Sequence, residues 1–312
     1  MLPRSIAAAI TAAGKGKGLR WWRLGERFIE GWILLAGILA IVILLGIVFF
    51  LVKEGVPIFF YTSPWEFFSG TRWYPVSEPP TFGILPFFVS TMMITLVSTA
   101  IAIPIGIGCA AYLAEVASPR IRETVKPLIE LLAGIPSVVM GFIGLILLSP
   151  LVQSTFNLNT GLTGFTAAIM LSMMSLPIII SVSEDALRAV PDDFKQASYA
   201  LGATRWETIR HVSIPAALSG ITAAVMLGVG RAIGETMTVL MVAGGALSVP
   251  RSPVEPMMPM TAAIASGIGN AVRGGLQYQA LFAIGLVLFV MTLGVNLIAG
   301  RVLERQKRKF AR

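Results

Sequence analysis

Charged residues are scarce in this chain of 312 residues. Only 13% are Asp, Glu, Lys or Arg, whereas 55% are apolar, and the mean hydropathy is +0.81. A soluble globular domain usually carries about a quarter charged residues. This shortage excludes a soluble globular protein and indicates an integral membrane protein.

Cysteine and histidine are nearly absent as well. The chain has one of each, Cys109 and His211. A single cysteine cannot form an internal disulfide, and one histidine without a cysteine or aspartate cluster does not indicate a metal site. The sequence also lacks a nucleophile motif, a glycine-rich phosphate loop and paired carboxylates. We therefore predict no catalytic residue, metal or cofactor on this chain, and a membrane-embedded enzyme is disfavoured.

Long apolar runs are what the chain does contain. A helix needs about 20 residues to cross the hydrocarbon core. Six runs reach that length: Trp32–Val52, Phe87–Leu113, Leu131–Val152, Leu162–Val182, Gly220–Ala243 and Ala280–Arg301. We predict an all-α integral membrane protein with six transmembrane helices. The parts are an N-terminal arm (1–30), a peripheral first helix (31–53), an external loop (54–82), a transmembrane core (83–302) and a basic tail (303–312).

The basic residues are unevenly placed. The net charge is +8, and nineteen of the 24 Lys and Arg lie in the N-terminal arm, Ala114–Pro127, Ser183–Ser213 or the last twelve residues, Arg301–Arg312. The positive-inside rule then predicts that both termini are cytoplasmic. This distribution argues against nucleic acid as a partner and favours membrane lipids, with the tail as a headgroup anchor. Residues Leu19–Glu30 predict an amphipathic helix on the inner face.

The loop between Lys53 and Phe82 is rich in aromatic residues. Such residues commonly form a belt at the membrane interface. The alternative is a docking surface for an external partner, and the sequence leaves both interpretations open.

The longest polar stretch between apolar runs is the second feature that stands out. Residues Pro191–Pro215 predict two short cytoplasmic helices joined at Leu201–Ala203, where Gly202 permits a tight turn. The apolar residues Phe194 and Trp206 need a place to pack. A groove on a partner protein and the chain's own membrane domain are the two alternatives.

The letters of this stretch, QASYALG followed by VSIP, resemble the cytoplasmic "EAA" loop of ABC importer permeases. Ala197, Gly202 and Pro215 match that pattern, whereas Gln196 replaces its glutamate and Ser198 its second alanine. Val212 and Ile214 replace the isoleucine and leucine of the pattern. The resemblance implies a coupling loop at about 187–215 that contacts a separate ATPase. The implied contact residues are Gln196, Ala197, Ser198, Gly202, Ala203 and Pro215.

Two further blocks, Ile129–Leu145 and Gly228–Val239, resemble the permeases of phosphate-specific importers, C-type rather than A-type. The similarity extends from about Ile84 to the C-terminus. It implies the type I ABC importer permease fold (MetI-like), with a five-helix core, in a prokaryotic cell membrane. It also implies three partners: an A-type sister permease, a cytoplasmic ATPase dimer that carries ATP and Mg, and an external phosphate-binding protein.

Two charges within the fifth apolar run call for an explanation. Arg231 is predicted near the bilayer centre, where a charge costs roughly 2.5–3.5 kcal/mol. Glu235 follows four residues later, on the same face of one continuous helix. The two side chains could form a structural ion pair, or the guanidinium could bind phosphate oxygens bidentately along a translocation path.

Small residues surround this predicted path. They are Pro136, Ser137, Gly228, Gly230 and Gly234. For the glycines, close helix packing is favoured over a role in the path. Two other functions stay open, namely a permease for another oxyanion such as molybdate or sulfate, and a passive anion channel.

Overall fold

The computed structural model describes residues 18–310, and the surroundings of the side chains of 28–301 and 304. The chain divides into two compact units, 1–53 and 54–312, each described by itself. Among the described residues, regular structure is helical apart from one two-stranded hairpin. This confirms the predicted all-α fold.

The first unit is built on a single helix. Helix α2 runs from Gly18 to Gly55 without a break, so the predicted inner-face helix Leu19–Glu30 is its beginning and not a separate element. Side chains from Phe28 to Ile47 are all exposed, although most are apolar. That exposure agrees with a lipid-facing first helix. The side chains of 18–27 and the first seventeen residues lie outside the described residues, so the predicted contact with the inner face stays a prediction.

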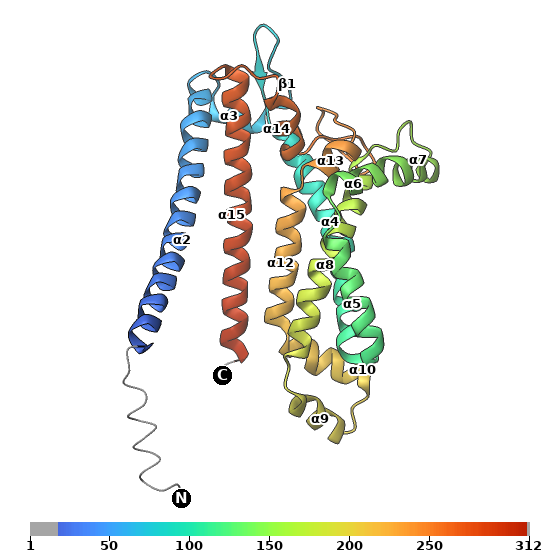
Figure 1. Cartoon of the computed structure of the whole chain (residues 1–312). Helices are drawn as coiled ribbons and strands as arrows, with labels where there is room; N and C mark the ends of the chain where they lie inside the picture. The colour runs from blue at the N-terminus through green and yellow to red at the C-terminus, as the bar shows by residue number, and fades with distance from the viewer. Residues whose placement is uncertain (1–17, 311–312) are drawn as a thin grey trace, which may run out of the picture. The chain divides into compact units, whose positions relative to one another are not determined.

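Four long helices lie side by side in the second unit (Figure 1). They are α4 (Leu85–Ala111), α8 (Gly164–Arg188), α12 (Leu218–Gly234) and α15 (Leu276–Phe310). Small residues let them approach closely. A Cβ at Gly228 would lie 2.7 Å from Ile179 of α8, and one at Gly220 would lie 2.3 Å from the Cβ of Ala186. Of the glycines that the sequence assigns to packing, Gly228 therefore does pack where α12 meets α8.

The third predicted span is divided. Its parts are α5 (Pro119–Ala133), α6 (Ser137–Ile143), the π-helical turn η3 (Gly144–Leu148) and α7 (Ser149–Phe156). Pro136 has no N–H to donate and disfavours the helical conformation at Ile135, so the helix predicted from Leu131 ends at Ala133. Figure 1 shows α5 along α8, and α7 turned away from it. The apolar span instead covers Ser137–Phe156.

The fifth predicted span is also broken. Helix α12 ends at Gly234, Glu235 is extended, and α13 runs from Met237 to Val242. Within the described part of the chain, five helices are long and apolar enough to cross a membrane. A sixth is counted if Leu218–Gly234 is joined to Arg205–Ala216, from which it is bent by 73°.

The loop after α2 folds on itself at one end of the second unit. The elements of the loop are η1 (Val56–Phe60), α3 (Pro64–Ser69), β1 (Trp73–Tyr74) and β2 (Thr81–Phe82). Helix α14 (Met260–Ile268) packs on them. The strands pair antiparallel, Trp73 with Phe82. Phe67, Trp73 and Phe82 are buried and pack with Phe87, whereas Phe60 and Trp65 are exposed. Part of the aromatic loop is thus a small core, and only the exposed part is available for a membrane belt or a partner.

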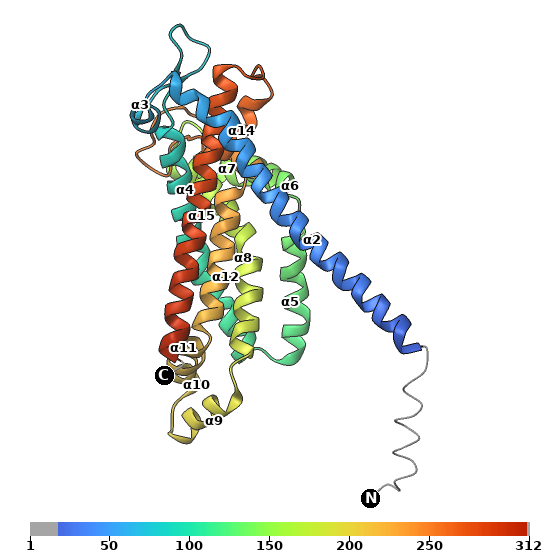
Figure 2. The same ribbon diagram turned by 90° about the vertical axis from the view of Figure 1, so that its left-hand side faces the viewer.

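The polar stretch lies at the opposite end, where α15 also ends (Figures 1 and 2). It consists of α9 (Asp192–Ala200), α10 (Arg205–Thr208), the π-helical turn η4 (Ile209–Ser213) and α11 (Ile214–Ala216). The two short helices predicted from the sequence are present, joined at Leu201–Ala203. Helix α8 extends to Arg188, so Glu184 and Asp185 belong to a core helix and not to the loop.

Candidate functional site

The break after α12 is closed by a carboxylate. The Oε1 atom of Glu235 accepts hydrogen bonds from the backbone N–H groups of Thr236 (3.2 Å), Met237 (3.2 Å) and Thr238 (3.5 Å). A helix start leaves such N–H groups without intrahelical acceptors, and in a membrane each must find one. The hydroxyl of Thr261 donates to the Glu235 carbonyl at 2.8 Å. The side chain of Glu235 thus stabilises the start of α13.

Arg231 lies in the last turn of α12 and is half-buried. The expectation that Glu235 lies on the same helical face is wrong, because the helix ends between the two residues. Within the described residues, the Arg231 side chain has no hydrogen-bond or ion-pair partner. The structural ion pair between Arg231 and Glu235, one of the two alternatives from the sequence, is therefore not formed.

The two sequence blocks that carry the resemblance meet at this break. The hydroxyl of Thr238 donates to the backbone carbonyl of Ser137 at 2.9 Å and lies 3.3 Å from the sulfur of Met174. Pro136 precedes α6 and Ser137 is its first residue. A Cβ at Gly141 would lie 3.2 Å from the Cα of Thr238, so α6 and α13 are in close contact.

The three glycines of α12 have different surroundings. Gly228 is buried against α8, and its carbonyl accepts a hydrogen bond from the hydroxyl of Ser175. A Cβ at Gly230 or Gly234 would meet no atom within 4 Å. Only Gly228 is explained by packing within the described chain; Gly230 and Gly234 leave open space near Arg231.

The turn of the polar loop depends on glycine. Gly202 has a φ of 86°, a left-handed conformation that other residues adopt with strain. Across the turn, the hydroxyls of Ser198 and Thr208 are 2.9 Å apart. Thr204 and Glu207 form a capping box at the start of α10, and hydrogen bonds from the backbone and side chain of Thr204 lower the pKa of Glu207. Gln196 and Ala197 are exposed on α9, and Ala203 and Pro215 are half-buried.

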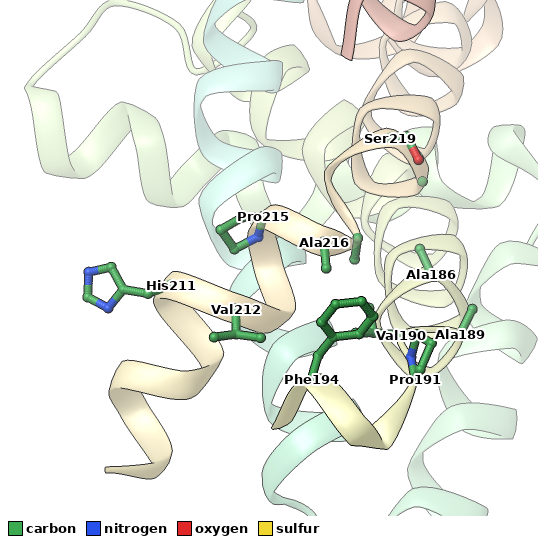
Figure 3. Close-up of a pocket in the computed structure, with 12 residues that line it drawn as sticks. Ala186, Ala189, Val190, Pro191, Phe194, His211, Val212, Pro215, Ala216 and Ser219 are labelled. Atoms are coloured by element: carbon green, nitrogen blue, oxygen red, sulfur yellow. The ribbon is translucent and has the colours of Figure 1, made fainter. Parts of the chain in front are cut away.

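An apolar groove of about 640 Å³ lies between this loop and the ends of α8 and α12. Figure 3 shows the ring of Phe194 beside Val190 and Pro191, with Pro215 on the other wall. The remaining lining residues are Ala186, Ala189, His211, Val212, Ala216, Ala217, Ser219 and Gly220. Phe194 is still 58% exposed, so the loop is only partly packed on its own membrane domain.

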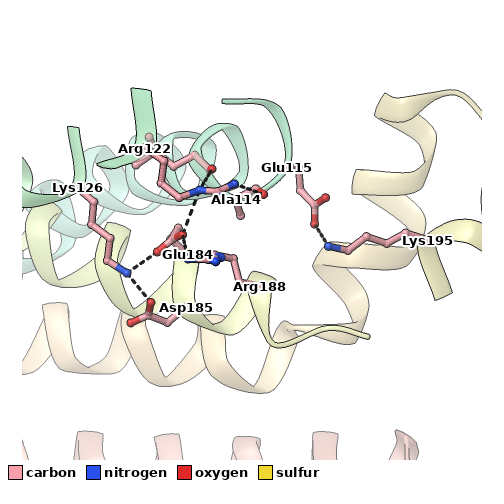
Figure 4. A network of polar contacts seen from close by, with 9 residues as sticks. Ala114, Glu115, Arg122, Lys126, Glu184, Asp185, Arg188 and Lys195 are labelled. Carbon is pink, nitrogen blue, oxygen red and sulfur yellow. Dashed lines mark hydrogen bonds and ion pairs between the residues drawn. The ribbon is translucent and has the colours of Figure 1, made fainter. Parts of the chain in front are cut away.

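A network of charges lies where α5, α8 and the polar loop meet (Figure 4). The Glu184 side chain is 1% exposed; it is 2.5 Å from the Lys126 Nζ and 3.7 Å from both the Arg122 Nε and an Arg188 Nη. Partial burial alone would lower the pKa of Lys126, but hydrogen bonds to Asp185 and Glu184 outweigh it, and the pKa is raised. These residues hold the ends of α5 and α8 together.

A second pair extends the network to α9. The carboxylate of Glu115 lies 3.1 Å from the Lys195 Nζ. Neither this pair nor the Glu184 cluster was expected from the sequence. The spacing of Glu184 and Arg188, four residues apart on one helix, was the available signal. The partners on α5 and α9 could not be found that way, because they come from other elements.

Comparison with known proteins gives a consistent result. Residues 102–310 match the model of the family described as "Binding-protein-dependent transport system inner membrane component". The chain is 39% identical over 277 residues to the probable ABC transporter permease protein YqgH of Bacillus subtilis, with 88% of each chain covered. It is 36% identical to the phosphate transport system permease protein PstC of Mesorhizobium japonicum, covering 80% of this chain and 84% of that one.

Solved structures agree on the fold. A chain of a bacterial ABC transporter that imports the acidic polysaccharide alginate has a TM-score of 0.59 at 18% identity, covering 91% of this chain and 99% of that chain. A chain of the MetNI methionine ABC transporter, in an inward-facing conformation, has a TM-score of 0.56 at 19% identity, covering 74% and 99%.

Proposed function

Because this chain belongs to the family of binding-protein-dependent transport system inner membrane components, we propose that it is the permease subunit of an ATP-driven importer of inorganic phosphate. The relatives named as phosphate transport permeases support phosphate over molybdate or sulfate. A multi-pass membrane protein of this family is a transporter subunit and not an enzyme.

The observation that carries the proposal is the guanidinium of Arg231 at the broken end of α12, which has no partner among the described residues. A half-buried cation without a protein partner needs an anion or water beside it. A guanidinium presents its N–H groups in a planar fork that matches two phosphate oxygens. A Cβ at Gly230 or Gly234 would meet no atom within 4 Å, so the same turns of α12 are open to an anion in this chain. Glu235 is occupied by backbone N–H groups, so its role is to shape the break rather than to contact phosphate.

The full importer in this proposal has four kinds of subunit. The A-type sister permease completes the path, and a phosphate-binding protein delivers the anion from outside. A cytoplasmic ATPase dimer holds ATP and Mg and contacts the loop through the exposed face of α9, including Gln196 and Ala197. Both chain termini and the loop then lie in the cytoplasm of a prokaryotic cell.

The test is uptake of labelled phosphate by the complete complex in vesicles. We expect uptake that requires ATP and the binding protein, and that excess molybdate or sulfate does not suppress. Arg231→Leu should nearly abolish it while the complex still assembles, and Gly108→Ala, where a Cβ meets no atom within 4 Å, is the matched control. Uptake without ATP would indicate a passive channel and would contradict the proposal.

A further inference from the structure

Helix α9 is attached to the membrane domain in an unusual way. None of its nine residues is buried: its Phe194 and Tyr199 are 58% and 44% exposed, and Leu201, which follows it, is 90% exposed. An apolar face therefore does not fix α9 in place. Its side-chain contacts are polar, and the one that reaches another part of the chain, from Lys195, goes to a residue at the end of α4.

That residue is Glu115, in the π-helical turn η2 (Tyr112–Val116) that continues α4. Its carboxylate pairs with Lys195 of α9 at 3.1 Å, with side chains 7% and 14% exposed. Its backbone carbonyl accepts a hydrogen bond from the guanidinium of Arg205, at the start of α10. The loop thus contacts the same residue from both sides of the Gly202 turn.

The end of α4 is well placed to carry a movement inward. Helix α4 packs along α8, where a Cβ at Gly106 would lie 2.6 Å from Ile179. Ile179 is also the residue against which Gly228 of α12 packs. A chain of direct contacts therefore leads from Lys195 through Glu115 and α4 to the helix that carries Arg231. Packed side chains and rigid helices in direct contact of this kind can carry energetic coupling between distant sites.

We propose that Glu115 is a positioning residue that transmits movement of the loop 191–215 to α4, with Lys195 and Arg205 as its two contacts. This rests on the proposed function, because it assumes that an ATPase moves the loop. The pair is specific rather than incidental. The other acidic neighbour of Lys195, Asp192, has a side chain that is 82% exposed and lies 3.6 Å away, so solvent screens it.

The experiment measures phosphate uptake and ATP hydrolysis together in the reconstituted complex. Glu115→Gln and Lys195→Gln should each lower uptake by about tenfold, in the range of ordinary coupling energies, and raise the ATP hydrolysed per phosphate transported. Exchange of the two charges, Glu115→Lys with Lys195→Glu, should restore a large part of the uptake. Lys195→Arg keeps the charge and should retain both activities. Asp192→Asn is the matched control and should change neither.

The outcomes separate clearly. Wild-type uptake and stoichiometry in both glutamine variants would overturn the proposal, and so would a charge exchange no better than the single changes. A variant that lowers uptake and ATP hydrolysis in equal proportion, per complex recovered, would show a merely structural role and would also overturn it. Failure of the wild-type complex to couple ATP to phosphate uptake would instead refute the proposed function.

Discussion

A single charged residue means different things at different places in this chain. Glu184 and Glu235 both lie in or beside apolar helices, yet the first is held by three cations and the second by backbone N–H groups. Arg231 has neither kind of partner within the described residues. A charge in a membrane segment is therefore explained only after its acceptors or donors are named.

Glu184 should be the carboxylate on which folding depends most. Glu184→Gln removes the carboxylate that Lys126, Arg122 and Arg188 share and leaves only Asp185 beside Lys126. We expect a loss of stability below the about 3–5 kcal/mol of a fully buried pair broken from one side, because the three cations are partly exposed. Thermal unfolding of the purified protein in detergent is the measurement. Asp185→Asn is the control, because that side chain is 65% exposed and an exposed pair contributes about 1 kcal/mol at most. Equal effects of the two changes would contradict this assignment.

Glu235 should tolerate loss of its charge but not loss of its oxygen. Glu235→Gln keeps a carbonyl oxygen for the N–H groups of Thr236 and Met237, so the unfolding temperature should stay near that of the wild type. Glu235→Ala leaves those groups without an acceptor and should cost about 1–3 kcal/mol for each buried one. Thermal unfolding of both variants in detergent is the measurement. A glutamine variant as unstable as the alanine variant would show that the charge itself is required.

At the scale of elements, sequence reasoning located helices but not their breaks. Apolar runs predicted the second, fourth and sixth spans well, because hydropathy is a property of composition. The break at Ile135 depends on the following proline, and the break at Glu235 depends on a carboxylate that caps the next helix. The periodicity of apolar residues predicts neither break. The site was predicted in part: its blocks were identified, but the contact of Thr238 with Ser137 and the Lys195–Glu115 pair depend on tertiary packing.

The Gly202 turn offers a test of the loop as an element. Gly202→Ala should cost about 1–2 kcal/mol, since its φ of 86° is left-handed, although a Cβ there would meet no other atom within 4 Å. Gly202→Asn should cost less, because asparagine adopts this conformation more readily. Gly202→Asp is expected to abolish phosphate uptake as well, by placing a charge against the ATPase. Gly108→Ala is a control for adding a methyl group in open space. Pull-down of the ATPase with each variant, together with melting, would reveal whether turn geometry or charge is responsible.

At the scale of the whole molecule, the basic residues make a prediction about orientation. The loop 191–215 and the end of α15 lie at the same end of the second unit, and both contain Lys and Arg residues, among them Lys195, Arg205 and Arg210 in the loop. Both should therefore face the cytoplasm, and the hairpin Trp73–Phe82 should face outside. Cysteines introduced at Val76 and at Arg312, in a Cys109→Ala background, would be labelled by an impermeant reagent in intact cells only at Val76. Labelling at Arg312 would contradict the orientation.

The π-helical turn at Gly144–Leu148 also restricts how the length of the chain can vary. In this turn the N–H of Ser149 donates to the carbonyl of Gly144, five residues back, so the turn holds one residue more than an α-helix would. Deleting one of these residues would give an ordinary α-helical turn, so α7 would keep its direction. A deletion in α6 would instead rotate α7 by about 100°. That rotation would carry the Ser149 carbonyl away from Gly161, which approaches it so closely that a Cβ would lie 1.8 Å away. A one-residue gap is therefore tolerated within this turn and excluded from α6, and the exposed hairpin residues Val76–Pro79 can be shortened or extended without changing a helix contact.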